Sequence, residues 1–128
     1  MITIDSDGTI TLYQGDSGEL VISGFDSAKK YTVFFAVQDK KRKFVGEELQ
    51  VSVNNSDTAT FVLTPSYTDL LTVPQNRPYE LYYYGIKVSE VGENNEDTLF
   101  IGDGTYGDMN YLVVYPRKVE GKNHESIQ

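Results

Sequence analysis

Apolar and polar residues alternate along most of this chain with a period of two residues. In the segment 48–53, for example, the order is Glu-Leu-Gln-Val-Ser-Val. Such alternation predicts a strand that turns one face toward a core and the other toward solvent. The pattern predicts strands at 2–4, 9–13, 19–23, 31–38, 48–53, 58–64, 79–89, 98–101 and 111–115.

Turn residues separate these segments. The sequence DSDG at 5–8 predicts a hairpin turn, because an Asp-Gly pair readily adopts the left-handed backbone that a tight turn needs. One short helix is expected after Thr64, which can cap it, and Pro65 suits its first position. Many short strands and a lone helix predict an all-β fold, an antiparallel β-sandwich of about eight strands.

The length of 128 residues predicts one domain, with the sandwich over 1–118 and a polar, disordered tail over 119–128. The chain has no cysteine, which excludes a disulfide framework and a cysteine metal site. No apolar run approaches the roughly 20 residues that span a bilayer, so no membrane contact is expected. The N-terminus lacks the basic and apolar regions of a signal peptide, so we expect synthesis in the cytoplasm.

The chain is acidic, with a formal net charge of −8. This charge argues against nucleic-acid binding, because contacts to phosphate need a basic face. One basic cluster occurs at 40–43, and a charged turn between two strands explains it better than a phosphate-binding patch or a localisation signal. Ten Tyr and six Phe make the chain rich in aromatic residues, which favour strands and interfaces.

The sequence GDSG at 15–18 is found around the nucleophilic serine of chymotrypsin-like proteases. A serine nucleophile of that kind needs a histidine base. The single histidine, His124, lies near the end of the chain in a polar segment, and Gly18 is followed by Glu19 where that family continues with a Gly-Pro turn. A polar turn between two strands explains the segment better. With no cysteine nucleophile and no phosphate loop, we expect no enzymatic activity.

Two acidic segments suggest a metal site. The sequence IDSDGTI at 4–10 resembles part of an EF-hand calcium loop. Alignment on Gly8, however, places Thr3 and Gln14 at the first and last ligand positions, where the loop needs carboxylates, so a hairpin turn explains the segment better. Carboxylates in 90–110 could hold Ca²⁺ between loops or form a glycosidase pair. They are Glu90, Glu93, Glu96, Asp97, Asp103 and Asp108. Solvated loops explain them better, so no cofactor is expected, with a loop Ca²⁺ site as the alternative.

The alternation also leaves a second apolar face. If Tyr82 and Tyr84 face the core, Leu81 and Tyr83 face outward. The outward face of a half-buried sheet is normally polar, so an apolar one indicates a protein interface, unless a bulge or covering loops bury it within the monomer. The residues expected to form this interface are Tyr13, Phe34, Leu81, Tyr83, Phe100, Val113 and Tyr115, and Val21 and Val62 are expected to face outward with them.

Strand and turn motifs follow a definite order over residues 9–116. They are LYQGDSGEL at 12–20, a strand ending in Leu63-Thr64, a turn with Thr68 and Leu71, the Tyr-rich strand Tyr82-x-Tyr84-x-Ile86, an acidic turn, Thr98-Leu99 and a final apolar strand at 112–114. This order resembles the Ig-like N-terminal domain of phage baseplate upper proteins and related phage tail proteins. The resemblance rests on strand and turn residues.

The resemblance implies an Ig-like sandwich that works by protein–protein assembly in a bacteriophage virion. Such a subunit would be a baseplate or tail adaptor, a head fibre or a capsid decoration protein. Its expected partners are other virion proteins and further copies of the chain, and its expected location is the virion, after synthesis in the host cytoplasm. The alternative is a carbohydrate-binding or adhesin-like sandwich, with Tyr106 as the ligand platform, although the chain has no Trp to serve a sugar site.

Overall fold

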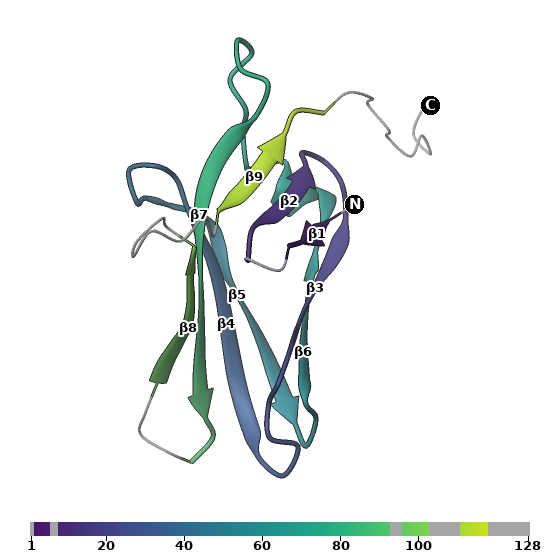
Figure 1. Cartoon of the computed structure of the whole chain (residues 1–128), viewed down its shortest axis with the longest axis vertical. Coiled ribbons are helices and arrows are strands. Elements are labelled where there is room, and N and C mark those ends of the chain that lie inside the picture. The colour runs from purple at the N-terminus through teal and green to yellow at the C-terminus, as the bar shows by residue number, and fades with distance from the viewer. Residues whose placement is uncertain (1, 6–7, 93–95, 103–110, 118–128) are drawn as a thin grey trace.

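The computed structural model describes residues 2–5, 8–92, 96–102 and 111–117, with 96–102 described by their backbone. In these residues the chain forms nine strands and one short helix (Figure 1). They are β1 (Thr3–Ile4), β2 (Ile10–Tyr13), β3 (Gly18–Ser23), β4 (Lys30–Gln38), β5 (Phe44–Asn54), β6 (Thr58–Leu63), α1 (Pro65–Thr68), β7 (Glu80–Glu90), β8 (Glu96–Gly102) and β9 (Leu112–Tyr115).

The strands form a large sheet and a small one. The large sheet has the order β1-β2-β9-β7-β4-β5, with β8 also paired to β7, and the small sheet consists of β3 and β6. β2 and β9 run parallel, whereas the other paired strands run antiparallel. β7 is the centre of the large sheet, because three strands pair with it. β9 pairs with residues 80–82, whereas β4 and β8 pair with its two edges over residues 83–90 and 84–89.

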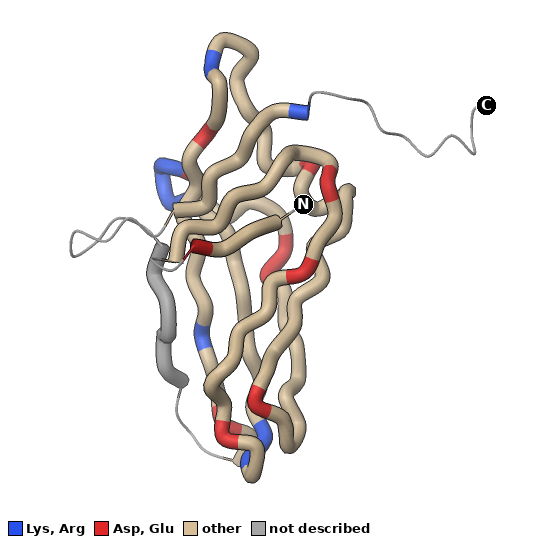
Figure 2. The backbone as a smooth tube through the Cα atoms, turned by 45° about the vertical axis from the view of Figure 1, so that its right-hand side comes forward, with Lys and Arg blue, Asp and Glu red and all other residues tan. Residues whose placement is uncertain are grey.

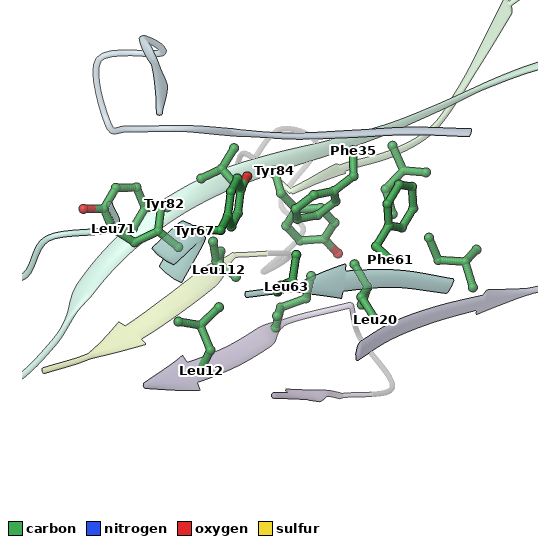
Figure 3. Packing of buried hydrophobic residues seen from close by; sticks show 14 of the residues in the cluster. Leu12, Leu20, Phe35, Phe61, Leu63, Tyr67, Leu71, Tyr82, Tyr84 and Leu112 are labelled. Atoms are coloured by element: carbon green, nitrogen blue, oxygen red, sulfur yellow. The ribbon is translucent and has the colours of Figure 1, made fainter. Parts of the chain in front are cut away.

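Side chains from the two sheets meet in one core (Figure 3). The ring of Phe35 on β4 lies 5.7 Å from that of Phe61 on β6 and 5.9 Å from that of Tyr84 on β7, measured between centroids. All three rings are almost fully buried. Burial of one such side chain stabilises the fold by roughly 1.5–3 kcal/mol. The predicted alternation is therefore confirmed for these strands.

β5 begins earlier than the sequence pattern predicts. We expected a strand from Glu48, but β5 starts at Phe44 and also includes Val45, Gly46 and Glu47. The register between β4 and β5 shifts between Phe35 and Val37, so a bulge carries the strand through this stretch. Gly46 has a φ of +74°, and a Cβ there would lie 3.1 Å from the ring of Tyr67.

The predicted helix forms where its capping residues indicate. The Thr64 hydroxyl accepts a hydrogen bond from the Tyr67 amide at 3.2 Å, and Pro65 occupies the first helical position. The helix fixes the turn that contains the protease-like sequence. The fully buried Thr68 hydroxyl accepts a hydrogen bond from the Gly15 amide at 3.0 Å and donates one to the Asp16 carbonyl at 2.8 Å. The segment 15–18 therefore serves as a structural turn.

The ends of the predicted domain are not covered by these ranges. The predicted tail at 119–128 and the boundary at 118 lie outside the described residues and stay predictions.

Tyr67 carries a buried hydroxyl that has no hydrogen-bond partner among the described residues. Burial raises the pKa of Tyr67 to about 12, because the phenolate would lose its hydration. The hydroxyl of Tyr82, in contrast, donates to the Thr72 carbonyl at 2.5 Å. Replacement of Tyr by Phe at these two positions therefore compares a buried hydroxyl that lacks a described partner with one that donates a hydrogen bond.

Tyr67→Phe is expected to leave the free energy of unfolding unchanged or to raise it by about 1 kcal/mol, because an unpaired polar group leaves the core. Tyr82→Phe is expected to lower it by about 1 kcal/mol, because the Thr72 carbonyl loses its donor. Urea unfolding at neutral pH measures both. A larger loss for Tyr67→Phe than for Tyr82→Phe would show that the Tyr67 hydroxyl has a partner, such as an ordered water.

Candidate protein interface on the large sheet

The outward side of the large sheet is built by the alternation of β7. Tyr82 and Tyr84 point into the core, and this leaves Leu81 and Tyr83 on the opposite side. Pairing extends the same side onto β9, since Leu81 lies opposite Val113. We call this side of β2, β9, β7, β4 and β5 the outer face.

One end of the outer face carries a tyrosine cluster of Tyr13, Tyr79 and Tyr115. The rings of Tyr13 and Tyr115 stack with centroids 5.3 Å apart, and the ring of Tyr79 lies 6.0 Å from that of Tyr115. Tyr13 is 41% exposed and Tyr79 is 36% exposed. Stacked aromatic rings that remain open to solvent offer a large contact area with little loss of side-chain freedom on binding.

The other end of the outer face is hollowed between β4, β5 and β7. We call this hollow the outer groove; its volume is about 400 Å³. Its lining residues are Phe34, Ala36, Gln38, Arg42, Phe44, Glu48, Tyr83, Tyr84, Gly85, Ile86 and Lys87. Phe44 at its margin is 64% exposed, the largest exposed fraction among the exposed large hydrophobic side chains of the described residues. The groove thus combines aromatic rings with both signs of charge.

Figure 2 shows the basic turn between β4 and β5 as a blue loop. Arg42 of this turn lines the outer groove. The Asp39 carboxylate accepts hydrogen bonds from the Lys41 amide at 2.8 Å and the Lys43 amide at 3.0 Å. Arg42 has a left-handed backbone with a φ of +64°, and its guanidinium carbon lies 5.4 Å from the Tyr83 ring centroid. The interpretation of this cluster as a charged turn between strands is therefore confirmed.

Glu80 links the same turn to β7 through an ion pair with Lys40. Its carboxylate lies 2.9 Å from the Lys40 ammonium and 3.5 Å from the Arg77 guanidinium, and it accepts a hydrogen bond from the Leu81 amide at 3.0 Å. Burial by itself would raise the pKa of Glu80, but the hydrogen bonds and the two cations together lower it. The turn is thereby held beside the first residues of β7.

Six of the seven predicted interface residues point outward from the large sheet: Tyr13, Phe34, Leu81, Tyr83, Val113 and Tyr115. Tyr13 is exposed and the other five are half-buried, partly by their neighbours on the same face. The seventh, Phe100, lies on β8 opposite Ile86, and its side chain is outside the described residues, as is Tyr106. Their role in binding stays a prediction.

Two residues predicted to lie on the outer face belong to the small sheet, and the sequence pattern missed other residues of the outer face. Val21 and Val62 face outward from the small sheet, so they do not share a surface with Tyr83. The sequence pattern gave no reason to choose Arg42 or Phe44, because the turn and the bulge that place them depend on the pairing of β4 with β5. Tyr79 could have been found, since it continues the outward alternation of the Tyr-rich segment.

The described residues contain neither a metal-binding cluster nor a membrane-spanning helix. Within the described residues, no group of three or more His, Cys, Asp or Glu side chains could hold a metal ion. The carboxylates of Glu93, Asp103 and Asp108, considered above for a loop Ca²⁺ site, lie outside those residues, as do the side chains of Glu96 and Asp97. No helix in the described ranges is long and apolar enough to cross a membrane.

Comparison with known proteins supports the architecture. A scan against protein-family models finds no matching family, and a search of the curated proteins finds no match. Among solved structures, the chain is similar to the periplasmic chaperone SfaE, with a TM-score of 0.58 and 10% sequence identity. The match covers 88% of this chain and 56% of that one.

This chain has an Ig-like β-sandwich fold. The predicted all-β class with one short helix is therefore confirmed, and the parallel pairing of β2 with β9 is the exception to its antiparallel order. At 10% identity the likeness concerns the fold alone, because one fold can carry many unrelated functions.

Proposed function

We propose that this chain is a non-enzymatic bacteriophage virion protein that binds another virion protein through the outer face. The observation that carries the proposal is the aromatic outer groove, formed on strands whose outward side would be polar if it faced only water. The resemblance of residues 9–116 to phage baseplate and tail domains supports the virion setting. A baseplate or tail adaptor, a head fibre and a capsid decoration subunit all fit this role.

The chemistry of binding would be burial of apolar surface with orientation by charge. Apolar area contributes about 25 cal/mol per Å², from which the cost of association must be subtracted. Aromatic residues in a central pocket commonly provide most of the binding energy of an interface. In the outer groove, Phe44 and Tyr83 supply such rings, while Arg42, Glu48 and Lys87 supply charges that would select the orientation of a partner.

The outer groove is also rigid enough to bind at low entropic cost. Its floor is formed by β4 and β7, which pair continuously from Tyr31–Glu90 to Gln38–Tyr83. Its margin is fixed by the hydrogen bonds to Asp39 and the ion pair of Lys40 with Glu80. A preformed surface loses less conformational freedom on association than a mobile one.

The proposal is tested on particles. Particles are banded from lysates of the cells that carry the gene, and their proteins are identified by mass spectrometry. We expect this chain in the particle band in a fixed ratio to the other structural proteins. Its absence from particles, in cells that do express it, would refute the virion assignment.

A photo-reactive phenylalanine analogue tests the surface. Placed at Phe44, it is expected to cross-link one other particle protein. Placed at Ser27, which is exposed in the turn between β3 and β4, it is expected to leave that protein uncoupled. Equal cross-linking from both positions would show that the outer face is not the contact.

A glycan array separates the carbohydrate alternative. Saturable binding that is lost in Tyr106→Ala and kept in Tyr83→Glu would favour the sugar-binding module over the assembly role.

A further inference from the structure

β3 is paired along only one of its two edges. Its partner is β6, and no other described strand pairs with it, so the small sheet ends at β3 (Figure 1). An open strand edge presents unpaired amides and carbonyls that can accept another strand. The outer face described above belongs to the other sheet, so this edge is a separate surface.

The pairing of β3 with β6 identifies the groups that point outward. The Gly24 amide donates to the Asp57 carbonyl at 2.9 Å, and in an antiparallel ladder only every second pair exchanges hydrogen bonds. The hydrogen-bonded residues of β3 within this ladder are therefore Gly18, Leu20 and Ile22. The amides and carbonyls of the alternate residues, Glu19, Val21 and Ser23, point away from β6.

The edge lacks the usual protection against strand addition. Natural edge strands are commonly blocked by Lys, Pro or a mid-strand bulge. β3 reads GELVIS, with one charged residue, and its register with β6 is unbroken from Gly18 to Ser23. Val21 on β3 is 51% exposed, so the strand presents an apolar side chain beside its free backbone groups. Val62 on the neighbouring β6 is 61% exposed and extends the apolar surface of the small sheet.

We propose that β3 pairs antiparallel with β3 of a second copy of this chain, about a two-fold axis at Val21. In this register Val21 lies opposite Val21 of the second copy, and Glu19 lies opposite Ser23. All outward amides and carbonyls of these three residues then find partners. The two small sheets join into one four-stranded sheet, and the exposed Val21 side chains cover each other.

Charge favours this register over the one centred on Glu19. An axis at Glu19 would place the two Glu19 carboxylates opposite each other, which is destabilising. An axis at Val21 separates them and faces each with the small hydroxyl of Ser23. The net charge of −8 on each copy opposes association at long range, so the dimer is expected to tighten as salt screens that repulsion.

Two substitutions at Ser23 that introduce opposite charges test this register. Ser23→Lys would face Glu19 of the second copy with an ammonium, twice per dimer, whereas Ser23→Glu would face it with a carboxylate. Sedimentation equilibrium of the full chain over a range of concentrations gives the dimer Kd. We expect Ser23→Lys to bind tighter than wild type and Ser23→Glu weaker, with Kd values roughly tenfold apart.

The matched control changes the same charge one strand away. Thr58 on β6 lies opposite Ser23 and is exposed. Thr58→Lys and Thr58→Glu are expected to have Kd values much closer to each other than the Ser23 pair. Wild type and Ser23→Lys that both stay monomeric at all concentrations would overturn the proposal, and so would equal Kd values for the two Ser23 variants.

Amide hydrogen exchange gives a second readout that does not depend on a variant. As the protein concentration rises, exchange at Glu19, Val21 and Ser23 is expected to slow, whereas Leu20 and Ile22 are already protected by β6. Dimerisation without slower exchange at those three amides would place the contact elsewhere. These measurements use the chain alone, so they can fail while the particle experiments succeed, and the reverse also holds.

Discussion

Tyr83→Glu is expected to abolish incorporation of the chain into particles while the chain still folds. In the folded chain the Tyr83 ring lines the outer groove, 6.0 Å from the ring of Tyr111 and 5.4 Å from the Arg42 guanidinium. A carboxylate at this position can reach Arg42 and water in the free chain. Within an apolar contact it would lose its hydration, which costs several kcal/mol unless it finds a partner. Quantitative mass spectrometry of banded particles measures the loss.

Two further variants test the interpretation of that result. Tyr83→Phe keeps the ring and is expected to enter particles at close to the wild-type ratio. Phe34→Glu places a carboxylate in the same groove from β4, opposite Lys87 on β7, and is expected to be excluded as Tyr83→Glu is. Circular dichroism and urea unfolding must show that both Glu variants fold. Folded Glu variants that enter particles normally would rule out the outer groove as the contact.

The sequence was sufficient to predict the outward side of the Tyr-rich strand. Alternation with a period of two determines which side chains share a face, and this rule needs no knowledge of the neighbouring strands. It was therefore correct for Phe35, Tyr82 and Tyr84 in the core and for Leu81 and Tyr83 outside it.

Alternation does not say which sheet a strand joins. Val21 and Val62 were predicted to lie with Tyr83, but β3 and β6 form the small sheet. The choice of a partner strand depends on contacts between residues that are far apart in the sequence. The parallel pairing of β2 with β9, for example, joins residues 10–13 to residues 112–115. The edge of β3 became visible only once these pairings were known.

The sequence pattern could not predict the outer groove, for a related reason. Its margin depends on a bulge that carries β5 past Gly46 and on a turn in which Arg42 takes a left-handed backbone. Both conformations are set by the pairing of β4 with β5, while their local sequence, rich in Lys and Glu, resembles an ordinary solvated turn. Phe44 consequently looked like a loop residue and is instead the exposed ring at the margin of the groove.

Thr68→Val is expected to lower the free energy of unfolding by about 1–3 kcal/mol, because two partly buried backbone groups lose this hydrogen-bond partner. The Thr68 side chain is fully buried, and its hydroxyl is the partner of both the Gly15 amide and the Asp16 carbonyl. Valine nearly preserves the shape of threonine but can neither donate nor accept. Urea unfolding of wild type and variant measures the difference.

Ser17→Ala is the matched control for this substitution. Ser17 is exposed in the same turn, and its side chain is the one that the protease-like sequence would make a nucleophile. Because the turn is held through Gly15 and Asp16, removal of the Ser17 hydroxyl is expected to change the free energy of unfolding by less than about 0.5 kcal/mol. A Thr68→Val variant as stable as Ser17→Ala would mean that water replaces the lost hydroxyl. In that case the Gly-bounded turn would be stable without the Thr68 hydroxyl, and the ion pair of Asp69 with Arg117 beside Gly15 would be the next contact to remove.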